Sequence, residues 1–401
     1  MLNYKYIEDL DIFEIFSNGR TYYYNDYVNQ LSDSKLVSKQ RNKYKKKNKR
    51  RRLVFLPSNI CNLNCTYCFS KNDRTQKELL QFEDIEEYLQ DIIRNNGEYP
   101  LHIIFTGGGE PTLNFRCIKD IVKKFSICND VSYHITTNGV FSEDVRQFLI
   151  DNNFKIAISI DGDYEIEKLQ QDDVLSKETY NIAINNAKYL KKAGQSVVIA
   201  VVLSEHVFKR FQENEDELVE KSIGFLANED FEIISVVFDS GIFYSPPNEE
   251  LMLSIANFCS YLIRWKQNHK NILVYCPHIY KDNYNFSQVG ICEGIQNYPN
   301  DIKIMPNGKL SFCNRIQIKD LEYPYEKIDD LKDKLMVNPL FKDALKKAIT
   351  KKKECIACIA RQTCISGVCP ASYLTNSDEE LEFYCKNNLC LRLHILEKFL
   401  I

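Results

Sequence analysis

Short runs of apolar and β-branched residues alternate with longer segments of helical periodicity from residue 53 to about residue 240. Such runs are typical of buried strands, and this alternation predicts a parallel sheet with helical crossovers. Six β–α units indicate an α/β fold, a (β/α)6 partial TIM barrel, whose site should lie at the carboxyl ends of the strands. We expect strands at 53–57, 101–105, 131–136, 154–160, 196–203 and 231–238, and helices such as 83–94, 177–192 and 249–270.

The first 52 residues combine a hairpin signal with a basic stretch. Asn18 and Gly19 separate two strand-like runs, 13–17 and 20–24. A type I′ turn needs positive φ at both central residues, which Asn-Gly supplies, so we expect a short N-terminal β-hairpin extension. Within residues 41–52, nine of twelve residues are Lys or Arg. Such a stretch is typical of a solvated linker, and it also suits docking of an acidic peptide or of nucleic acid.

Composition and charge restrict the class of protein. The chain has 401 residues, of which 44% are hydrophobic and 27% charged, and its formal net charge is −3. These values are typical of a soluble globular protein of two or three domains. The sequence shows neither a signal-peptide pattern nor an apolar run near the ~18 residues that span a membrane. We therefore expect a cytoplasmic protein without membrane contact, in which many of the fifteen cysteines are ligands rather than disulfides.

Three thiols follow the first expected strand. Cys61, Cys65 and Cys68 are spaced CxxxCxxC. Thiolates are soft ligands that suit iron–sulfur clusters or zinc. Three cysteines on a cubane of four irons leave one iron open, and an open iron can chelate the amino and carboxylate groups of S-adenosylmethionine (SAM). One electron passed to the adjacent sulfonium would then release a 5′-deoxyadenosyl radical. The alternative at this point is a zinc site.

The same loop resembles the CxxxCxφC signature of the radical SAM superfamily, with Tyr67 as the aromatic φ. Segments similar to other motifs of that family end the next three expected strands, namely Gly-Gly-Glu, Thr-Asn-Gly and Ser-x-Asp-Gly. Each segment alone is also typical of an ordinary turn. The resemblance implies that Gly108, Gly109 and Glu110 meet the amino group of the SAM methionine. It implies a cofactor pocket lined by Tyr67, Gly108, Gly109, Glu110, Thr137, Asn138, Ser159 and Asp161.

Most other cysteines gather in the last third of the chain. A Pro-Asn-Gly turn predicts a second hairpin over 302–312 and places Cys313 five positions after Gly308. Cys292, Gly308 and Cys313 spell C-x15-G-x4-C, and the block that begins at Cys355 spells C-x2-C-x5-C-x4-C. This pattern resembles the SPASM extension of radical SAM enzymes, with one extra residue before the last cysteine of the block. A zinc ribbon is the alternative for the CxxC block.

The SPASM resemblance implies two auxiliary [4Fe–4S] clusters, and hence three clusters in all. The outer cluster would be held by Cys355, Cys358, Cys364 and Cys385, with Cys390 as the alternative to Cys385. The inner cluster would be held by Cys292, Cys313, Cys369 and either Cys276 or no fourth cysteine. In the second case an open iron could bind a substrate thiolate.

We expect structural roles for the remaining cysteines and for the histidines. No partner at ligand spacing accompanies Cys117, Cys128 or Cys259, and such cysteines are typical of small buried residues. The six histidines are scattered along the chain, so we expect them to be structural.

The resemblance implies a radical SAM/SPASM peptide maturase in three parts, at 1–52, 53–270 and 271–401. Such an oxidoreductase takes an electron from a flavodoxin or ferredoxin and abstracts hydrogen from a ribosomally made precursor peptide. A thioether or carbon–carbon crosslink would follow. The alternative is an anaerobic sulfatase maturase, which forms formylglycine and resembles this chain except that an Asp base follows the G-x4-C cysteine. Asn314 stands there and cannot take a proton as a carboxylate does, which favours crosslinking.

A third interpretation is a radical enzyme that modifies nucleic acid and uses the basic stretch. The sequence contains no recognisable RNA-binding domain, which argues against a nucleic-acid substrate. A zinc-binding interaction protein without catalysis would leave the glycine-rich and Asn-containing segments unexplained.

Overall fold

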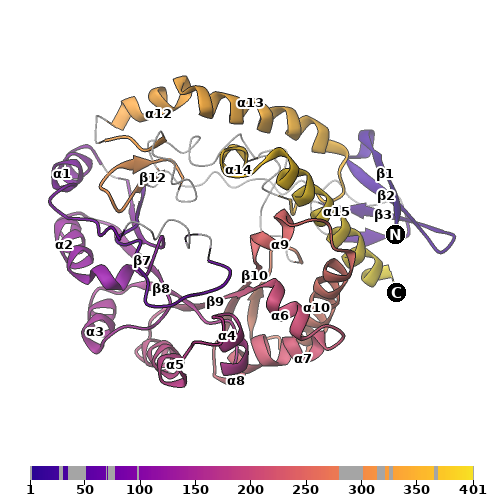
Figure 1. The fold of residues 1–401 in the computed structure, drawn as a ribbon, viewed down its shortest axis with the longest axis horizontal. Coiled ribbons are helices and arrows are strands. Elements are labelled where there is room, and N and C mark those ends of the chain that lie inside the picture. Colours follow the sequence, from indigo (N-terminus) through magenta and orange to yellow (C-terminus); the bar gives the residue numbers. More distant parts are fainter. Residues whose placement is uncertain are drawn as a thin grey trace.

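The computed structural model describes residues 2–26, 30–34, 51–68, 70, 77–96, 99–279, 301–313, 321–324, 328–364 and 369–400. The predictions for Cys292, for Asn314 and for most of the basic stretch lie outside these residues. The described residues form one sheet of four strands and one of nine. Figure 1 shows the smaller sheet at one end of the molecule, beside the C-terminal helix and both chain termini.

The larger sheet contains all six predicted strands in sequence order. They pair in parallel because a helical crossover follows each strand. Their bounds are β5 (Arg51–Phe55), β6 (Leu101–Phe105), β7 (Val131–Thr137), β8 (Lys155–Ser159), β9 (Val197–Leu203) and β10 (Ile233–Phe238). The α/β fold with a parallel sheet is thereby confirmed, and the partial barrel stays our interpretation of this strand order.

Three short strands that did not belong to the predicted barrel extend this sheet. β11 (Leu273–Tyr275) pairs in parallel with β10 at one edge. At the other edge, β12 (Asp301–Ile304) pairs in parallel with β5 and antiparallel with β13 (Leu310–Ser311). The predicted second hairpin is therefore present, with Gly308 at φ 76° in its turn. Its unexpected feature is that it lies beside the strand that leads to the first cysteine loop.

Helices cover the outside of the parallel strands, as Figure 1 shows for α1, α2, α3 and α5. The core between helices and strands includes Phe55, Phe105 and Phe154, whose rings stack with centroids 5.6 and 6.0 Å apart. The crossover helices are α1 (Glu86–Asn95), α2 (Phe115–Phe125), α3 (Glu143–Asp151), α4 (Tyr164–Leu169), α5 (Lys177–Lys192), α6 (Glu205–Arg210), α7 (Glu215–Val219) and α8 (Phe225–Asn228). They are followed by α9 (Ser240–Tyr244) and α10 (Glu249–Asn268).

The cysteine-rich part is mostly helical among the described residues. Asn338 caps α13 by accepting hydrogen bonds from Leu340 N and Phe341 N, and Pro339 occupies the first turn, where no donor is needed. A 3-10 turn, Cys355–Ala357, directly follows α13. The helices here are α12 (Ile328–Val337), α13 (Pro339–Glu354), α14 (Pro370–Thr375) and α15 (Asp378–Leu400).

The N-terminal extension is larger than the predicted hairpin. Asn18 and Gly19 have φ of 49° and 72°, so the predicted turn is confirmed. However, β2 and β3 lie inside an antiparallel sheet of four strands, because the residues on either side also pair. These strands are β1 (Asn3–Ile7), β2 (Ile12–Ser17), β3 (Arg20–Asn25) and β4 (Gln30–Ser32). We call them the N-terminal sheet.

Within the described part of the chain, none of the helices combines the length and apolarity that crossing a bilayer requires.

Candidate functional site

The first cysteine loop, residues 61–68, lies beyond the carboxyl end of β5. Its three thiols are partly exposed. Burial is the main cause that raises the pKa of Cys65 far above the usual range for a thiol, and nearby carboxylates and the other two thiols raise it further. Three thiolates so close together repel one another unless a cationic metal centre neutralises them. The donor set therefore fits an iron–sulfur cluster.

The start of the loop is held by the tip of β7. Asn138 Nδ2 donates to Asn62 Oδ1 at 2.7 Å and lies 3.8 Å from Cys61 Sγ. Asn62 Nδ2 in turn donates to Val140 O at 3.1 Å. These contacts fix the first cysteine relative to the parallel sheet.

The glycine-rich segment approaches the chain that leads into the loop. Gly109 N donates to Ser58 O at 2.8 Å, and Glu110 N donates to Ile60 O at 2.7 Å. A Cβ on Gly109 would lie 2.0 Å from Ile60 O, which leaves no room for any side chain. The resemblance had implied that Gly109 meets the amino group of the SAM methionine. In the described residues, the close approach at Gly109 is between two segments of backbone.

Glu110 is buried, with 2% of its surface exposed. Its Oε1 accepts hydrogen bonds from Thr112 N at 3.1 Å and from the hydroxyls of Thr112 and Thr137 at 2.7 Å each, and its Oε2 accepts from Asn138 N at 2.8 Å. Burial raises the pKa of Glu110, and these hydrogen bonds oppose that rise. The contacts described for Glu110 thus hold the tip of β7 in place.

The end of the loop is held by β8 and β9. Tyr67 Oη donates to Asp161 Oδ2 at 2.7 Å, and Val202 N donates to Asp161 Oδ1 at the same distance. Burial raises the pKa of Asp161 to about 6, although its hydrogen bonds from Val202 N, Tyr67 and Gln170 lower it. Asp161 is therefore a buried connection between strand tips, and Ser159 is partly exposed at the end of β8.

Gln170 belongs to the same network, although no sequence motif indicates it. Its side chain is completely buried, and Nε2 donates to Asp161 Oδ2 at 2.8 Å. Its Oε1 accepts from Ser204 N at 3.3 Å, and its backbone oxygen accepts from Thr66 N at 2.9 Å. A glutamine just after α4 matches none of the motifs, so only the structure identifies it.

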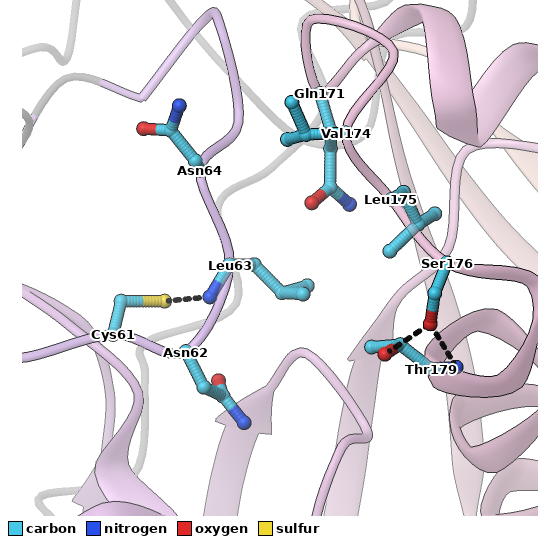
Figure 2. Close-up of a pocket in the computed structure, with 9 residues that line it drawn as sticks. All are labelled: Cys61, Asn62, Leu63, Asn64, Gln171, Val174, Leu175, Ser176 and Thr179. Carbon is cyan, nitrogen blue, oxygen red and sulfur yellow. Dashed lines mark hydrogen bonds between the residues drawn. The ribbon is translucent and has the colours of Figure 1, made fainter.

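A cavity of about 470 Å³ lies beside the loop. Figure 2 shows residues 61–64 on one side of this cavity and residues 171–179 on the other. Val174 and Leu175 give it an apolar part, whereas Ser176 and Thr179, which lie at the start of α5, give it a polar part. The cavity gives a small molecule access to the first cysteine of the loop.

Four distal thiols come together at the junction of α13 and α15. The thiols of Cys364 and Cys385 are hydrogen-bonded, which lowers the pKa of Cys385 to about 7. Burial raises the pKa of Cys355 to about 12, and the nearby thiols of Cys358 and Cys385 raise it as well. Cys390 instead has the carboxylate of Glu249 as its charged neighbour. The structure therefore brings the four cysteines of the predicted outer set together, and the fourth of them is Cys385 rather than Cys390.

The predicted inner set is brought together only in part. Cys313 and Cys369 pack against one small core that contains Phe312 and Phe341. Cys276 is completely buried in the main core instead, and its thiol is hydrogen-bonded to that of Cys259. The structure therefore places Cys276 with a thiol that we expected to be structural, and not against the core that holds Cys313 and Cys369.

Among the residues that the structure describes, no three His, Cys, Asp or Glu side chains converge on a point suited to a single metal ion. A [4Fe–4S] cluster binds its thiolates at separate iron atoms, so its ligands need not converge on one point.

Comparison with known proteins finds similarity in the part of the chain that holds the first cysteine loop. Residues 55–219 match the model of the radical SAM superfamily. A cysteine-type anaerobic sulfatase-maturating enzyme of Clostridium novyi is 30% identical over 195 residues, which cover 46% of this chain and 50% of that protein. The radical SAM cyclopropyl synthase TigE of Paramaledivibacter caminithermalis is 25% identical over 38% of this chain and 35% of that protein. The chain thus spans about half or less of the length of these relatives.

Among solved structures, anSMEcpe with bound AdoMet and the Cp18Cys peptide has a TM-score of 0.61 with this chain. The match covers 87% of this chain and 97% of that chain at 19% identity. At this identity the likeness shows the fold alone.

Proposed function

Residues 55–219 form a radical SAM domain, and on this premise we propose that the chain is a radical SAM oxidoreductase that modifies a peptide. The observation that carries the proposal is the first cysteine loop. Its three thiols lie together, and its two ends are bonded to the tips of different parallel strands. A loop held in this way presents the thiols to a cofactor with little loss of conformational freedom.

Cys61, Cys65 and Cys68 would hold a [4Fe–4S] cluster with one iron left for SAM. When bound, this cluster supplies one electron, taken from a flavodoxin or ferredoxin, that splits SAM into methionine and a 5′-deoxyadenosyl radical able to remove a hydrogen atom from the substrate. Hydrogen bonds that the thiolates accept would tune the reduction potential of such a cluster. The Leu63 N–H and the Asn138 amide, 3.5 and 3.8 Å from Cys61 Sγ, are donors of this kind.

The expected SAM-pocket residues other than Tyr67 divide into two groups. Gly109, Glu110, Thr137 and Asp161 are tied to the protein by the contacts described above, so we propose that they shape the pocket. Asn138 and Ser159 are partly exposed, and we propose that they bind SAM directly. Gly108 has a φ of 134°, which only glycine adopts readily, and we propose that its backbone meets the amino group of SAM.

The distal thiols would hold the auxiliary clusters, which accept the electron that is left on the peptide when the crosslink closes. Cys355, Cys358, Cys364 and Cys385 are the proposed outer set, and Cys313 and Cys369 belong to the inner set. Closing a crosslink removes two hydrogens from the peptide. One leaves as an atom with 5′-deoxyadenosine, and the other leaves as a proton, while its electron passes to an auxiliary cluster.

We propose a crosslink as the product because Asn314 stands where a sulfatase maturase has its Asp base. Formylglycine formation is the second candidate, and the similarity to the sulfatase-maturating enzyme favours it. Mass spectrometry of a cysteine-containing peptide separates the two reactions. A crosslink removes two hydrogens and retains the sulfur, whereas formylglycine formation from cysteine removes the sulfur.

The experiment that tests the proposal uses the full chain, reconstituted anaerobically with iron and sulfide and supplied with SAM and dithionite. The expected result is 5′-deoxyadenosine. The variant with Cys61, Cys65 and Cys68 all changed to Ala should form none and should keep about two thirds of the iron, because the other two clusters use separate cysteines. SAM cleavage by this variant, or none by the wild type, overturns the proposal.

A further inference from the structure

A buried arginine lies in the middle of the outer cysteine set. Arg361 stands between Cys358 and Cys364 and has 2% of its surface exposed. Its guanidinium donates to both carboxylate oxygens of Asp26, with Nε at 2.7 Å from Oδ2 and Nη2 at 3.0 Å from Oδ1. Nη2 also donates to Asp11 Oδ1 at 3.0 Å. One arginine of the cysteine-rich segment is therefore bound to two aspartates at one end of the N-terminal sheet, Asp11 directly before β2 and Asp26 directly after β3.

The strand register explains why the two aspartates need this arginine. Phe13 pairs with Tyr24 between β2 and β3, so two positions further along Asp11 and Asp26 reach the same end of the sheet. Asp26 is 1% exposed. Like charges at neighbouring positions repel, and a buried carboxylate without a partner is strongly unfavourable. The guanidinium is a cation that contacts both carboxylates and offsets their charges.

The same arginine also fixes the backbone around the first two cysteines of the set. Its Nη1 donates to Ile356 O at 2.6 Å, between Cys355 and Cys358. The guanidinium lies over the rings of Tyr6 and Phe13, with its central carbon 5.0 and 4.9 Å from their centroids. Ile359 packs into the core of the N-terminal sheet. The segment from 356 to 361 is thus fixed to the sheet by ionic, cation–π and apolar contacts.

We propose that the N-terminal sheet positions the outer auxiliary cluster, and that Asp26 and Asp11 do so through Arg361; this inference rests on the proposed function of the outer cysteine set. The geometry is specific because the planar guanidinium satisfies a bidentate carboxylate, a second carboxylate and a backbone carbonyl at once. Residues 2–26 therefore belong structurally with the distal cysteines, although more than 300 residues separate them in the chain. The aspartates are positioning residues, since they contact no proposed ligand in these bonds.

The test isolates the outer cluster in the full chain. In a background with Cys61, Cys65, Cys68, Cys313 and Cys369 changed to Ala, the remaining iron should be about four atoms per chain. Adding Asp26→Asn keeps the shape of the side chain and removes its charge. We expect the bound iron to fall at least twofold, and the Mössbauer or electron paramagnetic resonance spectrum of the remaining cluster to change.

Tyr24→Phe is the matched control. Tyr24 lies in the same sheet, is equally buried, and its hydroxyl accepts from Arg392 of α15 rather than from Arg361. Tyr24→Phe should lower the melting temperature but leave the outer iron and its spectrum unchanged. Equal iron in Asp26→Asn and its parent overturns the inference, as does an equal loss in Tyr24→Phe.

A further variant separates this inference from the proposed function. Cys355→Ala together with Cys385→Ala in the same background should remove the outer iron. If those changes leave the iron in place, the proposed outer cluster itself is wrong. If they remove it while Asp26→Asn does not, the cluster stands and only the positioning role fails.

Discussion

The hydroxyl of Tyr67 donates a 2.7 Å hydrogen bond to Oδ2 of Asp161, which lies 94 residues further along the chain. Tyr67 is part of the first cysteine loop, and Asp161 follows β8. The aromatic residue of the loop is thereby joined to a buried carboxylate that also accepts from the backbone of β9. The orientation of the cysteine loop thus depends on two strand tips outside it.

Removing this hydroxyl should impair SAM cleavage. Tyr67→Phe leaves Asp161 with fewer donors, and hydrogen bonds to charged groups contribute about 1.5–3 kcal/mol. We expect the free energy of unfolding to fall by about 2 kcal/mol and 5′-deoxyadenosine formation to fall on the order of tenfold, because the loop is less well positioned. Tyr133→Phe is the control, since its hydroxyl bonds Val122 O at 3.3 Å, away from the loop. Equal activity losses in both variants would contradict the positioning role.

Gly107 and Gly109, two of the three glycines directly before Glu110, should differ sharply in their tolerance of an alanine substitution. A Cβ at Gly109 meets Ile60 O at 2.0 Å, whereas a Cβ at Gly107 meets Gly109 O at an ordinary 3.4 Å. Gly109→Ala must shift the backbone before the cysteine loop, at a cost of about 1–3 kcal/mol. We expect it to lose iron from the first cluster and to stop SAM cleavage, and Gly107→Ala to retain both. Iron analysis and 5′-deoxyadenosine assays check this, and normal iron in Gly109→Ala would refute it.

Cys385 and Cys390 should differ in their contribution to iron binding. The thiol of Cys385 is hydrogen-bonded to that of Cys364, and Cys390 has Glu249 as its charged neighbour. We expect Cys385→Ala to lose about one third of the iron, the share of one cluster in three. Cys390→Ala should keep all of it. The reverse result would show that Cys390 is the ligand.

Cys276 should be dispensable for iron binding. Its thiol contacts Cys259 in the main core, so Cys276→Ala leaves a small cavity there and should cost about 1–2 kcal/mol. Cys369→Ala, by contrast, should lose the inner cluster. Iron content with anaerobic thermal unfolding distinguishes the two effects. Loss of iron in Cys276→Ala would show instead that Cys276 is the fourth ligand of the inner cluster.

His278 should make stability depend on pH. Its ring lies near Phe238 and Phe243, with centroids 5.0 and 5.4 Å away, and burial lowers its pKa from 6.5 to about 4. Below pH 6.5 the unfolded chain binds the proton more readily, so stability falls as the pH drops toward 4, by up to about 3 kcal/mol. His278→Phe should remove this part of the dependence. Denaturant unfolding at pH 7 and pH 5 measures it.

His206→Phe serves as the control for that experiment because its side chain is exposed on α6. It should unfold with the pH dependence of the wild type. If His278→Phe also keeps that dependence, another group causes it.

The sequence by itself determined the parallel strands and the place of the site. Apolar runs mark the strands, and the thiol, glycine-rich, Thr-Asn-Gly and Ser-x-Asp-Gly segments follow four successive ones. Because parallel strands end at one edge of a sheet, local periodicity is enough to bring these segments together. The turn at Asn18 and Gly19 was predictable for a similar reason, since its backbone angles depend on those two residues.

Only the tertiary structure decided what each polar group contacts. Glu110 and Asp161 are bonded to other strand tips, Gln170 joins Asp161 to Ser204 without any motif, and Cys276 contacts Cys259. Arg361 contacts two aspartates that flank strands of the N-terminal sheet. These contacts of Arg361 join segments more than 300 residues apart in the chain, and the others join residues that no local motif connects. The spacing of neighbouring residues in the sequence does not encode these contacts. They are set by how the helices, the two sheets and their buried charges pack.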